Sequence, residues 1–322
     1  MMRLIVDWTL MSLPISALVI TYNEEVNIGE CLDSVSFLSE VFVVDSFSTD
    51  RTVEICQKYE PAGVKVFQHR FEDYARQRNW ALKDLPWSKE WVFVLDADER
   101  VSPELRGELE ELFAGGEPDA DFYYVKRRFI FLGRWLKHSA LYPFWLVRFF
   151  RRSQARYTRS VNEQVIVPGK PGYLKHDLIH KDQKGLFAWI EKHNRYSSLE
   201  AKEYLAVKGG RDARSQCHWE QTGDRRDVRI QGLKSLFISL PFRPFIRFFY
   251  MYFWKRGFLD GKEGLIYSLL QATQEFHISA KIYESKTKTR VTHPYHIIGA
   301  RALGFRRKGR EASVGSVSEA KP

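Results

Sequence analysis

Two carboxylates that follow a short apolar run are the residues of this chain best suited to chemistry. Asp96 and Asp98 come directly after residues 91–95 (WVFVL), a run with the length and the β-favouring composition of a buried strand. Their i, i+2 spacing places both carboxylates on one side of an extended or turning chain. Carboxylate oxygens can hold a divalent cation, and such a cation can neutralise a diphosphate. The alternative is an ordinary solvated acidic turn, because an isolated Asp-x-Asp is common.

The elements that must position these carboxylates alternate between strands and helices. Apolar runs at 15–20, 41–44 and 64–67 predict three further short strands, with helices between them. This alternation predicts βαβ units and a parallel sheet. The first two runs end in polar loops, as the run at 91–95 does. Ligands of open α/β sheets bind outside the carboxyl ends of the strands, so we predict a nucleotide site at this edge.

Several helix boundaries can be predicted from capping residues. Asn23 or Asn27 is suited to cap the first helix, whose apolar face begins at Ile28. Another helix is expected at 103–113, because Ser102 is a favourable N-cap and is followed by proline at the first helical position.

Four motifs in a fixed order make the chain resemble a known family. VITYNEE at 19–25, VVDSFSTDRT at 43–52, ARQRNWA at 75–81 and LDADE at 95–99 are similar to motifs of the inverting family-two glycosyltransferases. The chain most resembles the bacterial group that adds a sugar, often glucose, to the lipopolysaccharide inner core. The resemblance implies the GT-A fold, an α/β, Rossmann-like and mostly parallel sheet with flanking helices. Phe47 departs from the pattern, since many relatives have glycine there.

The resemblance also implies roles for polar residues at the strand ends. Asp45 would contact the uracil or ribose of a UDP-sugar, and Arg78 would lie near its base or phosphates. Asp96 would hold the ribose or the metal, and Asp98 would bind the metal itself, Mg²⁺ or Mn²⁺. The base and ribose pocket would be lined by Thr21, Tyr22 and Glu24.

Two of these charged residues have structural alternatives. Arg78 could be a solvated helix residue paired with Glu72 or Asp73. Glu99 is expected to be structural, either paired with Arg100 or capping the helix at 103–113.

Inverting transfer needs one base that takes the proton of the acceptor hydroxyl. Glu163 is the predicted base, because relatives commonly have a carboxylate in this region. The alternative for Glu163 is an ion pair with Arg159, and Asp177 is a rival base. His180 is predicted to contact the metal or the diphosphate, although a lone histidine is more often an ordinary polar residue.

The stretch from Tyr123 to Ser160 carries ten basic residues and no Asp or Glu, with aromatic residues interleaved. It suits an acceptor with phosphate or other acidic groups, unless these are simply solvated strand faces. Single-stranded nucleic acid would also suit basic and aromatic residues together. The acidic cation site upstream argues against that reading, so no nucleic-acid partner is expected.

Beyond this stretch we expect a helix at 186–205 and a polar connection at 208–230. Residues 241–258 place five aromatic side chains on one face of a helix, with Arg243, Arg247 and Lys255 on another side. This helix either packs in the core or lies at a membrane surface, with its arginines meeting anionic lipid.

The predicted organisation has four parts. They are an N-terminal extension (1–11), a GT-A catalytic domain (12–185, with a nucleotide-sugar half at 12–115 and an acceptor half at 116–185), a helical acceptor and membrane region (186–305) and a disordered tail (306–322).

The bulk properties limit the compartment and the partners. The net charge of +10 over 322 residues favours an acidic partner, such as an anionic membrane surface. The three cysteines are far apart, which fits a reducing compartment. We find no signal peptide and no run of about 18 apolar residues, so a cytoplasmic protein, peripheral on the inner face of the cytoplasmic membrane, is expected.

The predicted activity is transfer of a hexose from a UDP-sugar to an acidic, lipid-linked saccharide such as the lipopolysaccharide core. One alternative is transfer to a polyprenyl phosphate, which needs no base because the acceptor is already an anion. An alternative of another class is a non-catalytic, basic nucleic-acid-binding protein.

Overall fold

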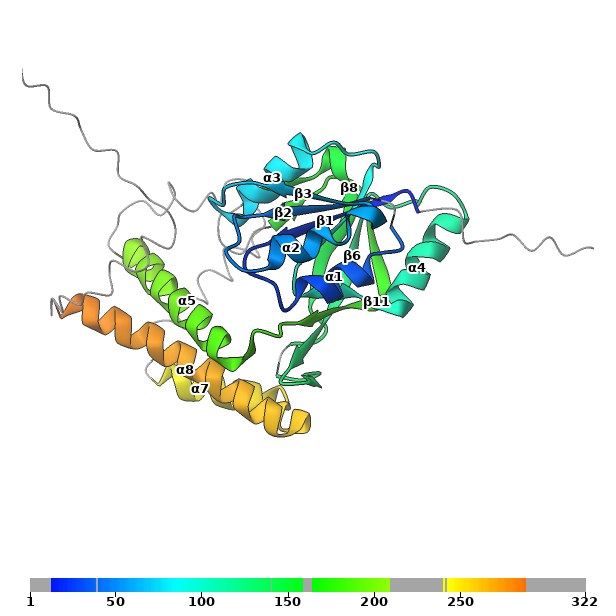
Figure 1. Cartoon of the computed structure of the whole chain (residues 1–322). Helices are drawn as coiled ribbons and strands as arrows, with labels where there is room; N and C mark the ends of the chain where they lie inside the picture. The colour runs from blue at the N-terminus through cyan, green and yellow to red at the C-terminus, as the bar shows by residue number, and fades with distance from the viewer. Residues whose placement is uncertain are drawn as a thin grey trace, which may run out of the picture. The chain divides into compact units, whose positions relative to one another are not determined.

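The computed structural model describes residues 13–38, 40–139, 141–158, 164–208, 240 and 242–287 (Figure 1). The predicted extension, the predicted base Glu163, most of the predicted connection and the predicted tail lie outside these residues. The chain divides into two compact units, Met1–Ile282 and Tyr283–Pro322, and the sheet and the candidate site belong to the first.

The first half of the fold consists of four parallel strands in the order β3-β2-β1-β4. The strands are β1 (Ile15–Thr21), β2 (Glu40–Asp45), β3 (Val64–Gln68) and β4 (Trp91–Asp96). The connections contain α1 (Ile28–Ser34), α2 (Thr52–Gln57), the short 3₁₀ helix η2 (Glu60–Ala62) and α3 (Tyr74–Asp84). This arrangement confirms the predicted βαβ units and parallel pairing.

The sheet becomes mixed beyond β4. The order continues β4-β8-β6-β11-β5, in which β8 is antiparallel to both of its neighbours, β6 and β11 are parallel, and β5 is antiparallel to β11. The remaining elements of this half are β5 (Glu99–Val101), α4 (Pro103–Ala114), β6 (Phe122–Phe131), β7 (Arg134–Trp135), β8 (Trp145–Arg151), η3 (Arg152–Gln154), β9 (Arg156–Thr158), β10 (Gln164–Ile166) and β11 (Pro171–Lys181). Strands β9 and β10 form a separate antiparallel pair.

Apolar side chains alternate between the two faces of the sheet and form two cores. Ala17 and Val19 pack with α1, α2 and α4 on one face, whereas Leu18 and Ile20 pack with α3 on the other. Because both faces are covered, every residue of β1 is buried, as an apolar run without alternation predicts.

Of the predicted caps, Ser102 forms its capping hydrogen bond and Asn27 does not. Ser102 accepts a hydrogen bond from the backbone N–H of Leu105 (3.2 Å), and Pro103 occupies the first turn of α4. Asn27 is the N-cap of α1 by position, but its amide donates to Glu24 and Asp182 instead of capping the helix. Asn27 therefore ties the end of β1 to the segment after β11.

The helical region packs on the end of the sheet. It consists of α5 (Gly185–Lys208), α7 (Arg243–Phe249), the π-helical turn η5 (Tyr250–Trp254), the 3₁₀ turn η6 (Gly257–Asp260) and α8 (Gly261–Lys286). Met251 and Tyr267 pack against Phe131 and Leu136 of the β6–β7 hairpin. Within the described residues, no helix combines the length and the hydropathy that crossing a membrane requires.

Candidate active site at the strand ends

Three parallel strands bring their polar ends to one place. The strand register pairs Thr21 with Asp45 and Ile20 with Asp96, so the ends of β1, β2 and β4 are adjacent. This is the convergence that the sequence predicted for the loops after these strands.

Asp96 is held on both sides by buried arginines. Its Oδ1 lies 2.5 Å from Nη2 of Arg78 on α3, and its Oδ2 lies 2.6 Å from Nη2 of Arg148 on β8. Burial would raise the pKa of Asp96, but Arg148 and Arg78 lower it below its usual value. Asp96 is therefore an anion whose two oxygens already have cationic partners.

The structural alternative for Arg78 is wrong. Arg78 is 1% exposed and pairs with Asp96, whereas its neighbour Arg76 pairs with Glu72 and Asp73 on the surface. The two arginines are two positions apart on α3, so they point in different directions around the helix.

Glu99 is structural, as predicted, but with a different partner. It is fully buried, accepts from the backbone N–H of Asp96 (3.0 Å) and lies 2.8 Å from Arg148. Burial raises the pKa of this carboxyl. Arg100 instead pairs with Glu30 (2.9 Å) and donates to the carbonyl of Asp98, so the predicted Glu99–Arg100 pair is wrong.

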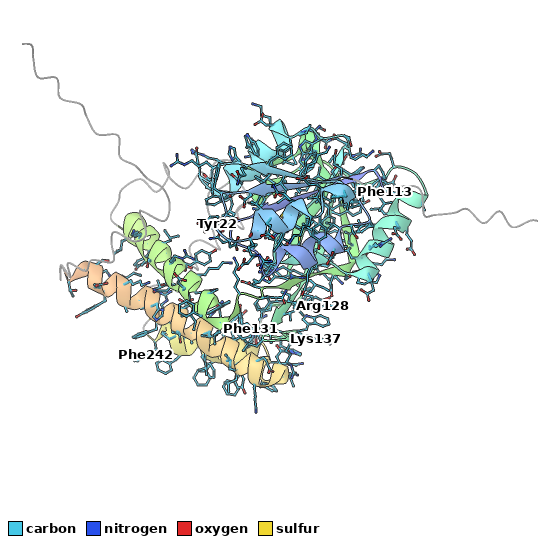
Figure 2. The ribbon with its side chains drawn as sticks, viewed as in Figure 1. Tyr22, Phe113, Arg128, Phe131, Lys137 and Phe242 are labelled. Atoms are coloured by element: carbon cyan, nitrogen blue, oxygen red, sulfur yellow. The ribbon has the colours of Figure 1, made fainter. Side chains whose placement is uncertain are left out.

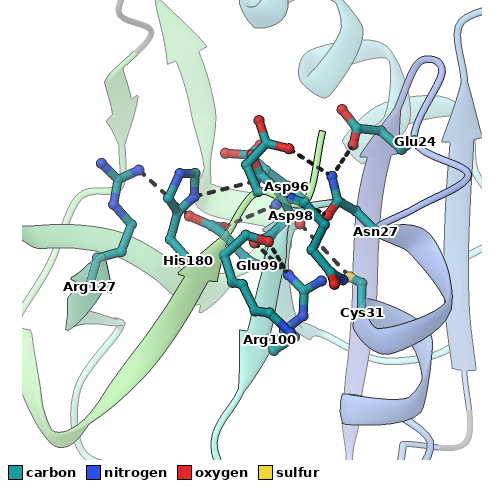
Figure 3. A network of polar contacts seen from close by, with 12 residues as sticks. Glu24, Asn27, Cys31, Asp96, Asp98, Glu99, Arg100, Arg127 and His180 are labelled. Atoms are coloured by element: carbon teal, nitrogen blue, oxygen red, sulfur yellow. Dashed lines mark hydrogen bonds and ion pairs between the residues drawn. The ribbon is translucent and has the colours of Figure 1, made fainter. Parts of the chain in front are cut away.

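Asp98 and His180 face each other at the end of β11. Strand β5 pairs antiparallel with β11 and places Glu99 opposite His180, which brings the ring next to Asp98 (Figure 3). The distance from Nδ1 of His180 to Oδ1 of Asp98 is 3.4 Å, and both atoms are buried without a hydrogen-bond partner in the described residues. Burial raises the pKa of Asp98, but His180 outweighs this and lowers it to about 2.

Glu24 lies beside this pair and is tied to the segment after β11. It accepts a hydrogen bond from Asn27 (2.8 Å) and forms an ion pair with Lys184. Burial raises the pKa of Glu24 in spite of these two donors. Lys184 therefore links Glu24 to a loop that is distant in sequence. Figure 3 shows the contact between Glu24 and its neighbour Asn27.

The other residues predicted to line the nucleotide pocket lie at the same strand ends. Thr21 is buried, and its hydroxyl has no hydrogen-bond partner in the described residues, whereas Tyr22 is half exposed. Asp45 is fully buried and accepts from the backbone N–H of Ser48 (3.0 Å) and from Gln68 (3.2 Å). In this conformation Asp45 orders its own loop.

Phe47 adopts a backbone conformation that explains the glycine of the relatives. Its φ is 60°, in the left-handed region that glycine favours. The loop keeps this turn even though a phenylalanine occupies it.

Two functional candidates were missed by sequence reasoning. The first is Arg148, which was only one of ten basic residues in a stretch. Its pairing with Asp96 and Glu99 depends on the neighbouring strands β4 and β8.

The second is Lys192, which lies on α5, is half-buried and has no ion pair or hydrogen bond to any described residue. Burial lowers the pKa of Lys192, but Tyr196, Asp98, Asp182 and Glu24 outweigh it and raise the pKa. Its ammonium thus lies within electrostatic reach of Asp98.

The rival base Asp177 is occupied. It is buried, and its oxygens receive Arg128 (3.2 Å) and the hydroxyl of Tyr142 (3.1 Å), with Lys126 at 3.6 Å. Both oxygens of Asp177 are therefore engaged by side chains of the protein.

Acids from elsewhere in the chain pair with much of the basic stretch. Besides the contacts of Asp177, Arg151 pairs with Glu117 (2.8 Å) and Arg134 lies near Glu263 (3.7 Å). Several of the basic residues within 123–160 are therefore paired with acids from outside that stretch.

The donor atoms at Asp98 and His180 fit a divalent cation. A buried carboxylate oxygen and a buried imidazole nitrogen without partners can each ligate Mg²⁺ or Mn²⁺. No group of three or more His, Cys, Asp or Glu residues suited to a metal occurs within the described ranges. Two protein ligands are enough when phosphate oxygens and waters complete the shell, as is common for Mg²⁺.

Two solved structures align with most of this chain. The mannosyltransferase PcManGT from Pyrobaculum calidifontis, in complex with GDP-Man and Mn²⁺, aligns over 86% of this chain and 89% of its own, with 14% identity and a TM-score of 0.48. Residues 1–349 of S. aureus TarS, in complex with UDP-GlcNAc, align over 86% and 92%, with 17% identity and a TM-score of 0.43.

Sequence comparisons identify the family. Residues 16–175 match the model of glycosyl transferase family 2. The lipopolysaccharide core biosynthesis glycosyltransferase LpsC of Rhizobium meliloti is 30% identical over 277 residues, which are 84% of this chain and 93% of LpsC. An uncharacterised glycosyltransferase of Rickettsia felis is 29% identical over 86% of this chain and 92% of its own. This chain is therefore a glycosyltransferase with the α/β GT-A fold, and it belongs to glycosyltransferase family 2.

Proposed function

We propose that this protein is an inverting glycosyltransferase that moves a hexose from a UDP-sugar to a hydroxyl of a lipid-linked saccharide such as the lipopolysaccharide core. The observation that carries the proposal is the pair formed by Asp98 and His180, whose facing atoms are buried and have no hydrogen-bond partner among the described residues. The relationship to LpsC supports the acceptor class.

The nucleotide part of the donor would bind along the ends of β1, β2 and β4. Thr21 offers a buried hydroxyl without a partner, and Tyr22 offers an exposed ring. The Arg78–Asp96–Arg148 cluster forms the floor beside them. We assign Asp96 to the ribose side of the site, because both of its oxygens already have guanidinium partners.

The diphosphate would lie next to Asp98 and His180, which would hold Mg²⁺ or Mn²⁺. A bound divalent cation supplies positive charge that neutralises the leaving diphosphate. Lys192 adds a second positive charge near Asp98 that no described residue neutralises by direct contact. Because Asp98, Asp182 and Glu24 keep Lys192 charged, its ammonium is available to an anion that binds beside Asp98.

Glu163 remains our candidate for the base, although it lies outside the described residues. The structure supports the choice only indirectly, because the rival Asp177 is engaged by Arg128, Lys126 and Tyr142. Glu163 would take the proton of the acceptor hydroxyl as the oxygen attacks the anomeric carbon from the side opposite UDP.

The protein would work at the cytoplasmic face of the membrane, where a lipid-linked acceptor is accessible. Its net charge of +10 favours an anionic surface.

A binding experiment tests the donor side first. We expect UDP with Mn²⁺ to raise the melting temperature more than UDP alone, because ligands that bind only the folded state stabilise it. An oligonucleotide should have no such effect. Stabilisation by the oligonucleotide and none by UDP with Mn²⁺ would contradict the proposal and favour the nucleic-acid-binding alternative.

Transfer assays test the chemistry. UDP-sugars are first screened for slow hydrolysis to identify the donor, and extracts are then screened for an acceptor that takes the sugar directly from that UDP-sugar as UDP leaves. Asp98→Ala should abolish metal-dependent transfer, and wild-type turnover in this variant would refute the site assignment. Glu163→Gln should retain UDP binding and lose transfer to a hydroxyl acceptor. Undiminished turnover by Glu163→Gln would instead support a polyprenyl phosphate acceptor, which needs no base.

A further inference from the structure

The segment from Phe242 to Phe258 exposes several aromatic rings. We call them the aromatic surface, which consists of Phe242, Phe245, Phe249, Phe253, Trp254 and Phe258. Trp254 is 79% exposed and Phe242 is 74% exposed. Figure 2 shows Phe242 at the outer edge of the helical region. An exposed apolar patch of this kind marks a site of interaction, whereas single exposed apolar residues are ordinary on protein surfaces.

The opposite side of the same segment is fixed to α8 by its arginines. Arg243 is 4% exposed and forms an ion pair with Glu275, and Arg247 lies 3.5 Å from Gln271. Met251 is buried against the β6–β7 hairpin. The expectation that these two arginines meet lipid is therefore wrong, as is the core alternative for the aromatic face.

The exposed charged residues of the segment from Phe242 to Lys262 are all basic. Lys255, Arg256 and Lys262 are exposed at its edge. Asp260 is the only acid between Phe242 and Lys262, and it is buried, where it accepts from the ring of His138 (2.8 Å) and from two backbone N–H groups. No exposed carboxylate interrupts this basic edge between Phe242 and Lys262.

We propose that the aromatic surface inserts into the headgroup region of an anionic bilayer, with Lys255, Arg256 and Lys262 contacting the lipid phosphates. Phenylalanine and tryptophan on one side of a helical segment, bordered by lysine and arginine, are the composition of interfacial segments. A second copy of this chain fits less well, since a two-fold contact would bring the same three cations together. The inference rests on the proposed function, because membrane binding would give the enzyme access to a lipid-linked acceptor.

Vesicle co-sedimentation of the full chain, without donor or acceptor, tests the surface. Wild-type protein should bind vesicles of phosphatidylethanolamine and phosphatidylglycerol more tightly than vesicles of phosphatidylcholine. Phe245→Ser should weaken this binding about tenfold, and Phe245→Ser with Phe249→Ser should weaken it further. Tyr173→Ser is the matched control, because Tyr173 is 62% exposed on β11 and Phe245 is 63% exposed. It should leave vesicle binding unchanged.

Salt and UDP separate the possible outcomes. Raised salt should weaken binding less than the loss of Phe245 and Phe249 does, since apolar insertion is not screened. Stabilisation by UDP with Mn²⁺ should be the same in all variants, which shows that each variant is folded. The proposal is overturned if wild-type protein ignores anionic vesicles or if the phenylalanine variants bind as wild type does. It is also overturned if wild type is a dimer, the variants are monomers and their vesicle binding is equal. Vesicle binding that depends on Phe245 in a protein without transferase activity would refute the proposed function and leave this inference standing.

Discussion

The strand ends and the helical region both bury arginine next to a carboxylate, but they leave different groups without partners. At the strand ends, Arg78 and Arg148 occupy both oxygens of Asp96, and an oxygen of Asp98 is left over. In the helical region, Arg243 forms an ion pair with Glu275 of α8, and the aromatic rings of the aromatic surface are exposed to solvent. We propose that these groups bind the ligand of each region, a cation with a diphosphate at the strand ends and lipid at the helical region.

The largest loss of stability is expected from substitution of Arg148, which is buried between Asp96 and Glu99. Arg148→Met leaves Glu99 fully buried without its main cation, so the free energy of unfolding should fall by about 3–5 kcal/mol. Urea unfolding measures this change. Arg76→Met, which removes a surface ion pair, is the control and should change stability by less than about 1 kcal/mol. Equal losses in the two variants would contradict the distinction between Arg148 and a surface arginine.

A smaller loss is expected in the helical region. Arg243→Met leaves the half-buried carboxylate of Glu275 on α8 without its cation. The free energy of unfolding should fall by about 2 kcal/mol. Arg243→Met with Glu275→Met should recover most of this loss, because both charged partners are then absent. Failure of the double variant to recover would show that Arg243 stabilises α7 by packing alone.

Substitution of Lys192 tests whether its ammonium contributes to UDP binding. Lys192→Met should leave the unfolding free energy unchanged, because the side chain has no direct polar partner in the part of the chain that the structure describes. It should weaken UDP binding about tenfold, measured by calorimetry. Lys202→Met, at an exposed position of the same helix, should do neither. A loss of stability without a loss of UDP affinity would assign Lys192 a structural role.

The smallest effect is expected at Phe47. Phe47→Gly removes the cost of a left-handed backbone at a half-exposed residue but makes the unfolded chain more flexible. The two effects nearly cancel, so stability should rise by about 0.5 kcal/mol. A fall of the urea midpoint that corresponds to more than about 1 kcal/mol would mean that the Phe47 ring contributes contacts of its own.

Local sequence was sufficient for the elements of the nucleotide half. Apolar runs such as 15–20 predict buried strands because parallel strands are covered on both faces, and Ser102 followed by Pro103 predicts the start of α4. The polar loops after β1, β2 and β4 could likewise be placed together, since parallel strands end at a common edge.

Pairing between distant residues could not be predicted in the same way. The partners of Arg148 and Arg78 depend on the strand order β4-β8, which the periodicity of a single strand does not contain. Helical spacing placed the aromatic residues of α7 on one face, but it did not indicate which face would meet α8. Glu275, more than thirty residues beyond Arg243 in the sequence, decides this by pairing with it.

The central claim is that Asp98, and not Asp96, holds the cation, because of the two only Asp98 retains an oxygen without a hydrogen-bond partner among the described residues. Calorimetric titration of UDP with and without Mn²⁺ tests it directly in Asp98→Asn and Asp96→Asn. We predict that Asp98→Asn binds UDP equally with and without Mn²⁺, whereas Asp96→Asn still binds UDP more tightly when Mn²⁺ is present. Retained Mn²⁺ dependence in a folded Asp98→Asn, together with its loss in Asp96→Asn, would contradict the account.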